Sequence, residues 1–129
     1  FRSLFAPSPG EQHTFGIFVV EQLFRCDGWL VEVTPQLSTT ELGEAVAADW
    51  YSLLGLSMSC AQFAGRMAVT IEKVRSASLN PDLRILVGGH AFLSDPDLVQ
   101  QVGADAMATD GQDAVRQAHA LPLAAVRHG

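Results

Sequence analysis

A carboxylate, a histidine and a glycine near the start of the chain have a spacing that could hold a ligand. Glu11 precedes His13 by two residues, and Gly16 follows three residues later. The segment joins a predicted strand to a predicted helix. In an open α/β sheet, ligands bind at the carboxyl ends of the strands, where such a segment lies. The rest of the chain must decide whether His13 holds a cofactor or merely lies near one.

Strand patterns and helix patterns alternate along the chain. Strands are predicted over residues 2–7, 29–33, 51–57, 83–87 and 105–108, of which 29–33 alternates and 51–57 is a continuous apolar run. Helices are predicted over residues 14–27, 38–48, 61–78 and 110–120, and from residue 94 onward. Five strands, each followed by a helix, predict an α/β fold with a parallel sheet covered on both faces. Their number and length fit a flavodoxin-like, doubly wound order 2-1-3-4-5.

Capping residues mark several helix ends. Gly28 is expected to stop the first helix in a left-handed conformation. Ser38 and Glu41 form a capping-box pattern at the start of the second helix. Ser94 and Asp110 are predicted as the N-caps of the last two helices.

The composition excludes some classes of function. The chain has 129 residues, with 14 acidic and 8 basic side chains and a formal net charge of −6. Nucleic-acid surfaces need clustered Lys and Arg, so no direct DNA contact is expected. No apolar run approaches the roughly 18–20 residues of a membrane span, and no signal-peptide pattern is present. The composition therefore indicates a globular domain without a membrane segment.

Length and cysteine content indicate one cytoplasmic domain. The length fits a single domain over residues 1–129. Because the sequence starts at Phe1 and not at Met, we expect this domain to be part of a longer regulatory protein. Cys26 and Cys60 form no CxxC motif, which indicates free thiols in a reducing compartment. Cys26 is expected in the core, and Cys60 either packs there or serves as a soft ligand.

Several ligand sites known in this fold class do not fit the loops. A phosphoacceptor receiver needs an aspartate where Ser57 ends the third strand, and a lysine after the fourth strand, where this chain has none. The G-x-G-x-x-G fingerprint of dinucleotide binding and the P-loop are both absent. The segment over residues 8–13 lacks the Ser, Thr and Asn content of a flavin-phosphate loop.

The loops that remain resemble the cobalamin (B12)-binding domain family. That family has D-x-H-x-x-G after the first strand, S-x-L after the third and G-G after the fourth. This chain has Glu11-x-His13-x-x-Gly16, Ser57 with Ser59, and Gly88-Gly89 in the same order. Its segment over residues 102–110 also resembles the closing G-A-D-A segment of the family.

This resemblance implies a role for each of the matching residues. His13 would be the axial ligand of the metal, and Glu11 would orient the imidazole. Gly16 would let the first helix approach the cofactor. Ser57 would hydrogen-bond the nucleotide tail of the cobalamin, and Gly88-Gly89 would clear space for that tail. His90 follows these glycines and is a candidate second ligand.

Departures from the family pattern favour a different tetrapyrrole. Glu11 replaces the aspartate and Ser59 replaces the leucine. Ile17 and Phe18 are large apolar residues that would crowd a nucleotide tail but would suit a flat macrocycle. In these respects the chain resembles the haem-binding variant of the B12 domain, found in antirepressors of photosynthesis genes in purple bacteria. The expected cofactor is haem, the alternative is cobalamin, and a cofactor-free domain remains open.

The resemblance to that variant implies a non-enzymatic regulatory sensor. It would bind haem and transmit redox, oxygen or light signals to a transcriptional repressor through protein–protein contacts. The alternative is the cobalamin-binding module of a methyltransferase, a mutase or a cobalamin-dependent regulator. A third hypothesis is a degenerate scaffold that only binds neighbouring domains or proteins.

Overall fold

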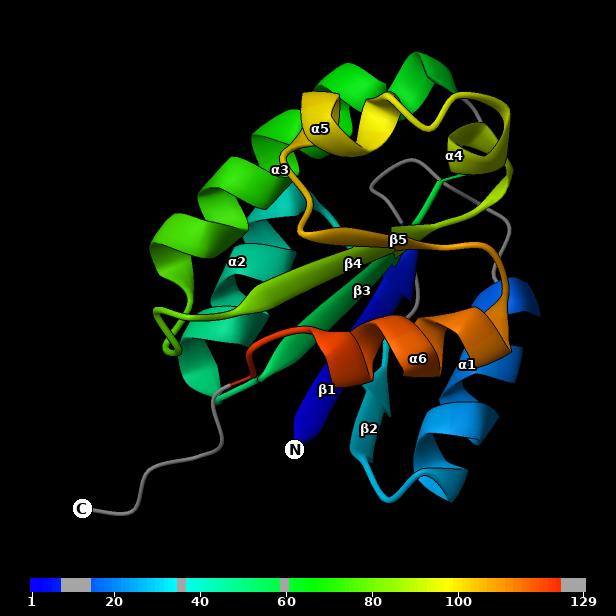
Figure 1. Cartoon of the computed structure of the whole chain (residues 1–129). Coiled ribbons are helices and arrows are strands. Elements are labelled where there is room, and N and C mark those ends of the chain that lie inside the picture. The colour runs from blue at the N-terminus through cyan, green and yellow to red at the C-terminus, as the bar shows by residue number, and fades with distance from the viewer. Residues whose placement is uncertain (8–14, 35–36, 59–60, 124–129) are drawn as a thin grey trace.

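The computed structural model describes residues 1–7, 15–34, 37–58 and 61–123, and within these it leaves out the side chains of residues 15–18 and 63. The elements follow the predicted alternation (Figure 1). The strands are β1 (Arg2–Pro7), β2 (Leu30–Val33), β3 (Leu53–Ser57), β4 (Arg84–Gly88) and β5 (Ala106–Ala108). The helices are α1 (Phe15–Cys26), α2 (Thr39–Ala48), η1 (Ala61–Phe63), α3 (Ala64–Ala77), α4 (His90–Ser94), α5 (Leu98–Val102) and α6 (Gly111–Ala120).

The five strands form one parallel sheet in the order β2-β1-β3-β4-β5, as the sequence predicts. Helices α1 and α6 pack together on one face, and α2 and α3 pack together on the other (Figure 1). The central strands β1 and β3 are almost entirely buried, which explains their continuous apolar sequences. This arrangement brings the carboxyl ends of β1, β3, β4 and β5 to the same edge of the sheet.

Two of the predicted helix starts are confirmed. The Ser38 side chain accepts a hydrogen bond from the Glu41 backbone, and the Glu41 side chain accepts one from the Ser38 backbone, so the capping box is complete. The Asp110 side chain accepts a hydrogen bond from the Asp113 backbone at the start of α6. Gly28 has the expected positive φ, at 92°.

The predicted N-cap at Ser94 is wrong. Ser94 is the last residue of α4, and α5 begins four residues later at Leu98. The reason is Pro96, which disfavours helical backbone in the residue before it. Asp95 accordingly has φ −143° and ψ 87°, and α4 ends there.

The predicted core position of Cys26 is also wrong. Cys26 is exposed in the last turn of α1, where Phe24 is the fully buried residue. A helix end buries only the residues on its inner face, and Cys26 lies two positions beyond Phe24. Cys60 lies outside the described residues.

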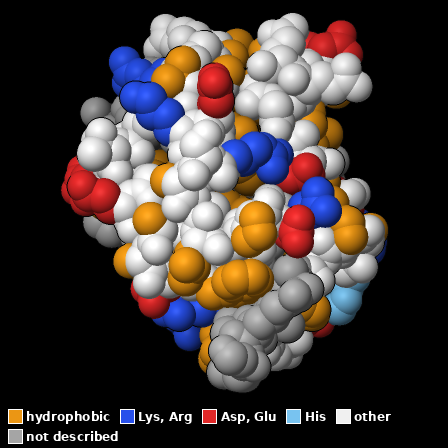
Figure 2. All heavy atoms as spheres, turned by 90° about the vertical axis from the view of Figure 1, so that its left-hand side faces the viewer, with side chains coloured by type: hydrophobic (Ala, Val, Ile, Leu, Met, Phe, Trp, Pro, Cys, Tyr) orange, Lys and Arg blue, Asp and Glu red, His pale blue; other side chains and the backbone are white. Residues whose placement is uncertain are grey.

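The surface carries mixed charge on the face that Figure 2 presents. Basic and acidic side chains lie among one another there, beside scattered apolar side chains. Over the ranges that the structure describes, no helix has both the length and the apolar character needed to cross a membrane.

Candidate functional site

A cavity of about 230 Å³ lies at the carboxyl edge of the sheet, beneath α1 and α6. Strands β1, β3 and β4 form its floor, Val20 and Ala114 line it from the two helices, and the loop after β5 closes one side. Ligands in doubly wound folds bind at this edge, near the point where the strand order reverses. The cavity is therefore the candidate ligand site.

Small residues leave this space open at the edge of the sheet. Ser57 pairs in register with Gly88, and Gly88 pairs with Ala108. These register partners on neighbouring strands form the last row of the sheet at this edge, and the row carries almost no side-chain volume. One row deeper, Gly55 stands between Phe5 and Leu86. The helices that rest on the larger residues of the deeper rows therefore bridge over the last row instead of filling it.

Gly89 fixes the course of the loop after β4. Its φ of 110° and ψ of 168° belong to a region that side chains other than glycine essentially never adopt. A Cβ at this position would overlap the carbonyl oxygen of Met58. Two backbone hydrogen bonds hold the loops together, from Met58 N to Gly88 O (3.0 Å) and from Ala91 N to Met58 O (3.3 Å). Met58, directly after β3, is thus tied to the loop after β4.

Ser57 brings an unpaired polar group to the cavity. Its Oγ is buried and has no hydrogen-bond partner among the described residues. Burying a hydroxyl without a partner costs about 1–3 kcal/mol in proteins. An unpaired hydroxyl in a mostly apolar cavity is the kind of group that a ligand satisfies.

The loop after β5 contributes residues that sequence reasoning did not assign to the site. Thr109, Asp110 and Gly111 all line the cavity. The Asp113 carboxylate accepts hydrogen bonds from the Thr109 backbone N (2.9 Å) and Oγ1 (3.2 Å). The backbone bond is the main cause that holds the pKa of Asp113 below its ordinary value. The topology could have predicted these residues, because this loop also follows the carboxyl end of a strand.

Gly111 allows α6 to lie close to α1 at the cavity. A Cβ at Gly111 would lie 2.6 Å from Leu23 Cδ1 and 3.6 Å from Val19 Cγ1. The first of these distances is too short for two carbon atoms, so the end of the Leu23 side chain would have to shift to admit a larger residue. Gly111 thus lies in close contact with α1 beside the cavity.

Three of the residues predicted for the site come together at this cavity, namely Ser57, Gly88 and Gly89. Gly16, Ile17 and Phe18 lie in the first turn of α1, but their side chains are outside the described part of the structure. The remaining predictions, Glu11, His13 and Ser59, fall outside the described residues altogether.

His90, the candidate second ligand, and Met58, which follows β3, are not among the residues that line the cavity. His90 is exposed at the start of α4, with Nε2 3.3 Å from Ser94 Oγ. Met58 is fully buried and belongs to the core on the α2–α3 face of the sheet. Within the described ranges, no group of three or more His, Cys, Asp or Glu side chains could hold a metal ion.

The strand order and the cavity define a doubly wound α/β domain with a cavity at the carboxyl edge of its sheet. A model of the B12 binding domain matches residues 2–119, and the chain belongs to that family. No curated protein sequence matches it significantly.

Solved structures agree with this fold. A cobalamin-binding protein from Desulfitobacterium hafniense has a TM-score of 0.82 and 21% identity, over 92% of this chain and 58% of that chain. The monomethylamine corrinoid protein of Methanosarcina barkeri has a TM-score of 0.77 and 19% identity, over 91% of this chain and 56% of that chain. A CheY-like protein from Pseudomonas aeruginosa has a TM-score of 0.67 and 18% identity, over 93% and 96%. At these identities the likeness shows the fold alone, and the chain spans less than two thirds of the first two proteins.

Proposed function

We propose that this chain is a cobalamin-binding module whose cavity receives the nucleotide tail of the cofactor. The observation that carries the proposal is the buried Ser57 hydroxyl, which has no partner in the described part of the chain and lies in a cavity framed by Gly88 and Gly89. A heterocyclic base with ring nitrogens would satisfy that hydroxyl while its flat faces contact the apolar walls. A bound cobalamin would supply a cobalt centre, and by the family resemblance His13 would hold it.

The size of the cavity favours a nucleotide base over a whole macrocycle. Its volume of about 230 Å³ exceeds the roughly 150 Å³ that holds a single benzene ring. It is smaller than the roughly 300–1,000 Å³ of pockets that enclose drug-sized ligands. A flat two-ring base fits this space, whereas a porphyrin does not. Haem has no nucleotide tail that could occupy the cavity.

A haem-binding sensor that signals to a transcriptional repressor is the second candidate. The feature that favours it is the apolar sequence of α1, with Ile17 and Phe18 in its first turn and Val19 exposed over 41% of its surface. The comparisons support the B12-binding family but not this narrower resemblance. The expectation of haem as the first cofactor therefore yields to cobalamin.

Titration of the purified chain with three tetrapyrroles tests the proposal. We expect a saturable change in the absorbance of hydroxocobalamin, with an affinity at least about tenfold above that for cobinamide, which lacks the nucleotide tail. His13→Ala should alter the spectrum of the bound cobalamin. A saturable Soret shift with haemin and no binding of cobalamin would support the second candidate instead. If neither cofactor binds, both candidates fail.

Removing the Ser57 hydroxyl should separate cofactor binding from stability. Ser57→Ala eliminates an unpaired buried group, so the cofactor-free domain should keep its stability or gain up to about 1 kcal/mol. Cobalamin should bind about tenfold more weakly because one hydrogen bond is lost. Urea unfolding and absorbance titration measure the two effects.

Ser3 provides a matched control for that prediction. Its Oγ is likewise buried without a hydrogen-bond partner among the described residues, but Ser3 lies in β1 one row below Phe5, next to Leu53, and does not line the cavity. Ser3→Ala should therefore affect unfolding in the same way and leave the cobalamin affinity unchanged. Equal binding by the two variants would contradict the assigned role of Ser57.

A further inference from the structure

The floor of the cavity depends on two residues in adjacent strands. Phe5 of β1 and Gly55 of β3 are register partners and face the α1–α6 side of the sheet. A Cβ on Gly55 would overlap Cδ1 and Cε1 of the Phe5 ring. The ring therefore lies over the glycine and occupies the space that a side chain would take there.

Neighbouring aromatic rings hold Phe5 in this position. Its ring meets Phe24 of α1 edge to face, with centroids 4.8 Å apart, and Phe24 meets Trp29 in the same way at 5.2 Å. Phe5 is only 4% exposed although it lines the cavity. Because Phe24 is fully buried, the Phe5 ring cannot move toward α1 without disturbing the core.

The last row of the sheet places no comparable bulk at the cavity. Ser57, Gly88 and Ala108 form its rim, so a flat group that enters from the carboxyl edge passes small residues first. It then meets the Phe5 ring one row deeper, because alternate residues of a strand face the same side. The depth available to the group is therefore the distance from the rim to Phe5.

We infer that the Phe5–Gly55 pair sets the depth of the cavity and thereby selects the size of the nucleotide base that a corrinoid can place there. This inference rests on the proposed function and adds a specificity determinant to it. With Phe5 over Gly55, the cavity accepts a compact two-ring base. A methyl group on Gly55 would displace the ring toward the space that the base occupies. A smaller residue at position 5 would deepen the cavity.

Binding of corrinoids with and without a base tests the pair. Dissociation constants are measured for cobalamin, which carries dimethylbenzimidazole, for the corrinoid that carries adenine, and for cobinamide. For Gly55→Ala we expect the preference for cobalamin over cobinamide to fall by about tenfold or more, as expected when one methyl group changes a close-packed pocket. For Phe5→Leu we expect the preference between dimethylbenzimidazole and adenine to change by at least about threefold. The deeper cavity no longer matches the size of the base that the unsubstituted cavity selects.

A double variant distinguishes a local effect of Gly55→Ala at the cavity from misfolding. In Phe5→Leu/Gly55→Ala the added methyl group enters the space that the ring has left, so the preference for cobalamin over cobinamide should be largely restored. Ile85→Val, in the core on the opposite face of the sheet, is the packing control and should leave every ratio unchanged. Circular dichroism and thermal unfolding report the fold of each variant.

The outcomes distinguish this inference from the proposed function. If the unsubstituted chain binds no corrinoid, the proposed function fails. If it binds cobalamin better than cobinamide, but folded Gly55→Ala keeps that preference, the depth inference alone is overturned. The depth inference is also overturned if the effects of the two substitutions on the preference for cobalamin simply add in the double variant. Two residues that share one space must show coupling.

Discussion

Replacement of Gly89 by alanine should lower the free energy of unfolding by about 3 kcal/mol or more. Two costs combine at this position. The backbone at φ 110° and ψ 168° is one that an L-residue essentially does not adopt, and the new methyl group would overlap the Met58 carbonyl. The loop after β4 must therefore move, which breaks the hydrogen bond from Ala91 N to Met58 O. Because Gly89 lines the cavity, binding of cobalamin should be lost as well.

Gly28→Ala is the matched control for Gly89→Ala. Gly28 also has a positive φ, at 92°, but within the described part of the chain no atom lies within 4 Å of a Cβ built there. Only the backbone cost remains, about 1–2 kcal/mol, and the position is remote from the cavity. Urea unfolding should show a smaller loss for Gly28→Ala, and titration should show unchanged cobalamin binding. Equal losses of stability would mean that contact with Met58 contributes nothing.

The fold could be predicted from the sequence because its signals are local and repeated. Gly28 and Gly88-Gly89 mark ends of two of the apolar runs, and the Ser38–Glu41 box fixed one helix start within a residue. Strand order followed from the alternation of strands and helices, which leaves few topologies. The error at Ser94 arose where two signals compete, since a serine that could cap a helix precedes a proline that disfavours helix.

The site was predictable only in part, for a physical reason. Ser57, Gly88 and Gly89, which line the cavity, could be picked out because glycine pairs and polar residues at strand ends stand out in a sequence. Phe5 and Gly55 were missed because each looks like ordinary core within its own strand. Their relation exists only across the β1–β3 register, which periodicity along one strand does not contain. The depth of a cavity is a property of several strands together.

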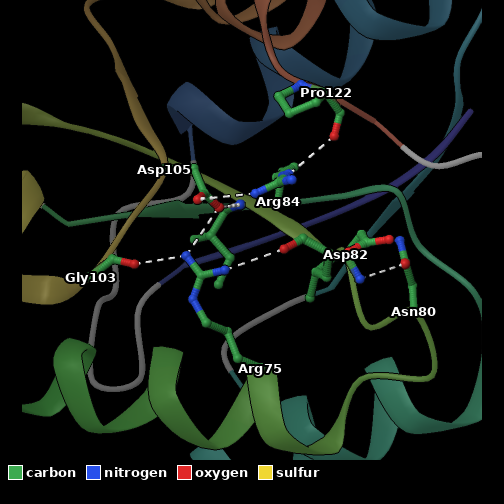
Figure 3. A network of polar contacts seen from close by, with 9 residues as sticks. Arg75, Asn80, Asp82, Arg84, Gly103, Asp105 and Pro122 are labelled. Carbon is green, nitrogen blue, oxygen red and sulfur yellow. Dashed lines mark hydrogen bonds and ion pairs between the residues drawn. The ribbon is translucent and has the colours of Figure 1, made fainter.

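Asp105 links three elements at the opposite edge of the sheet from β2 (Figure 3). Its Oδ2 accepts hydrogen bonds from Ile85 N (2.7 Å) and from the Arg75 guanidinium (3.0 Å). Its own N–H donates to Ile85 O (2.9 Å). Arg75 also donates to Gly103 O (2.8 Å), and Arg84 lies 3.9 Å from Asp105 Oδ1. The side chain thus completes the pairing of β4 just before β5 begins.

Asp105→Ala should therefore destabilise the domain by about 2–4 kcal/mol. Ile85 is fully buried, so its N–H would lose its partner without access to water, and Arg75 would lose its ion pair. Asp105→Asn keeps an amide oxygen for Ile85 N but removes the charge, and it should cost about 1 kcal/mol. Urea unfolding at low and high salt separates these contributions, because salt weakens only the ionic part. The difference between Asn and Asp should shrink in high salt, whereas the larger loss in the alanine variant should persist. If both variants lose the same stability, the hydrogen bond to Ile85 is not what secures β5.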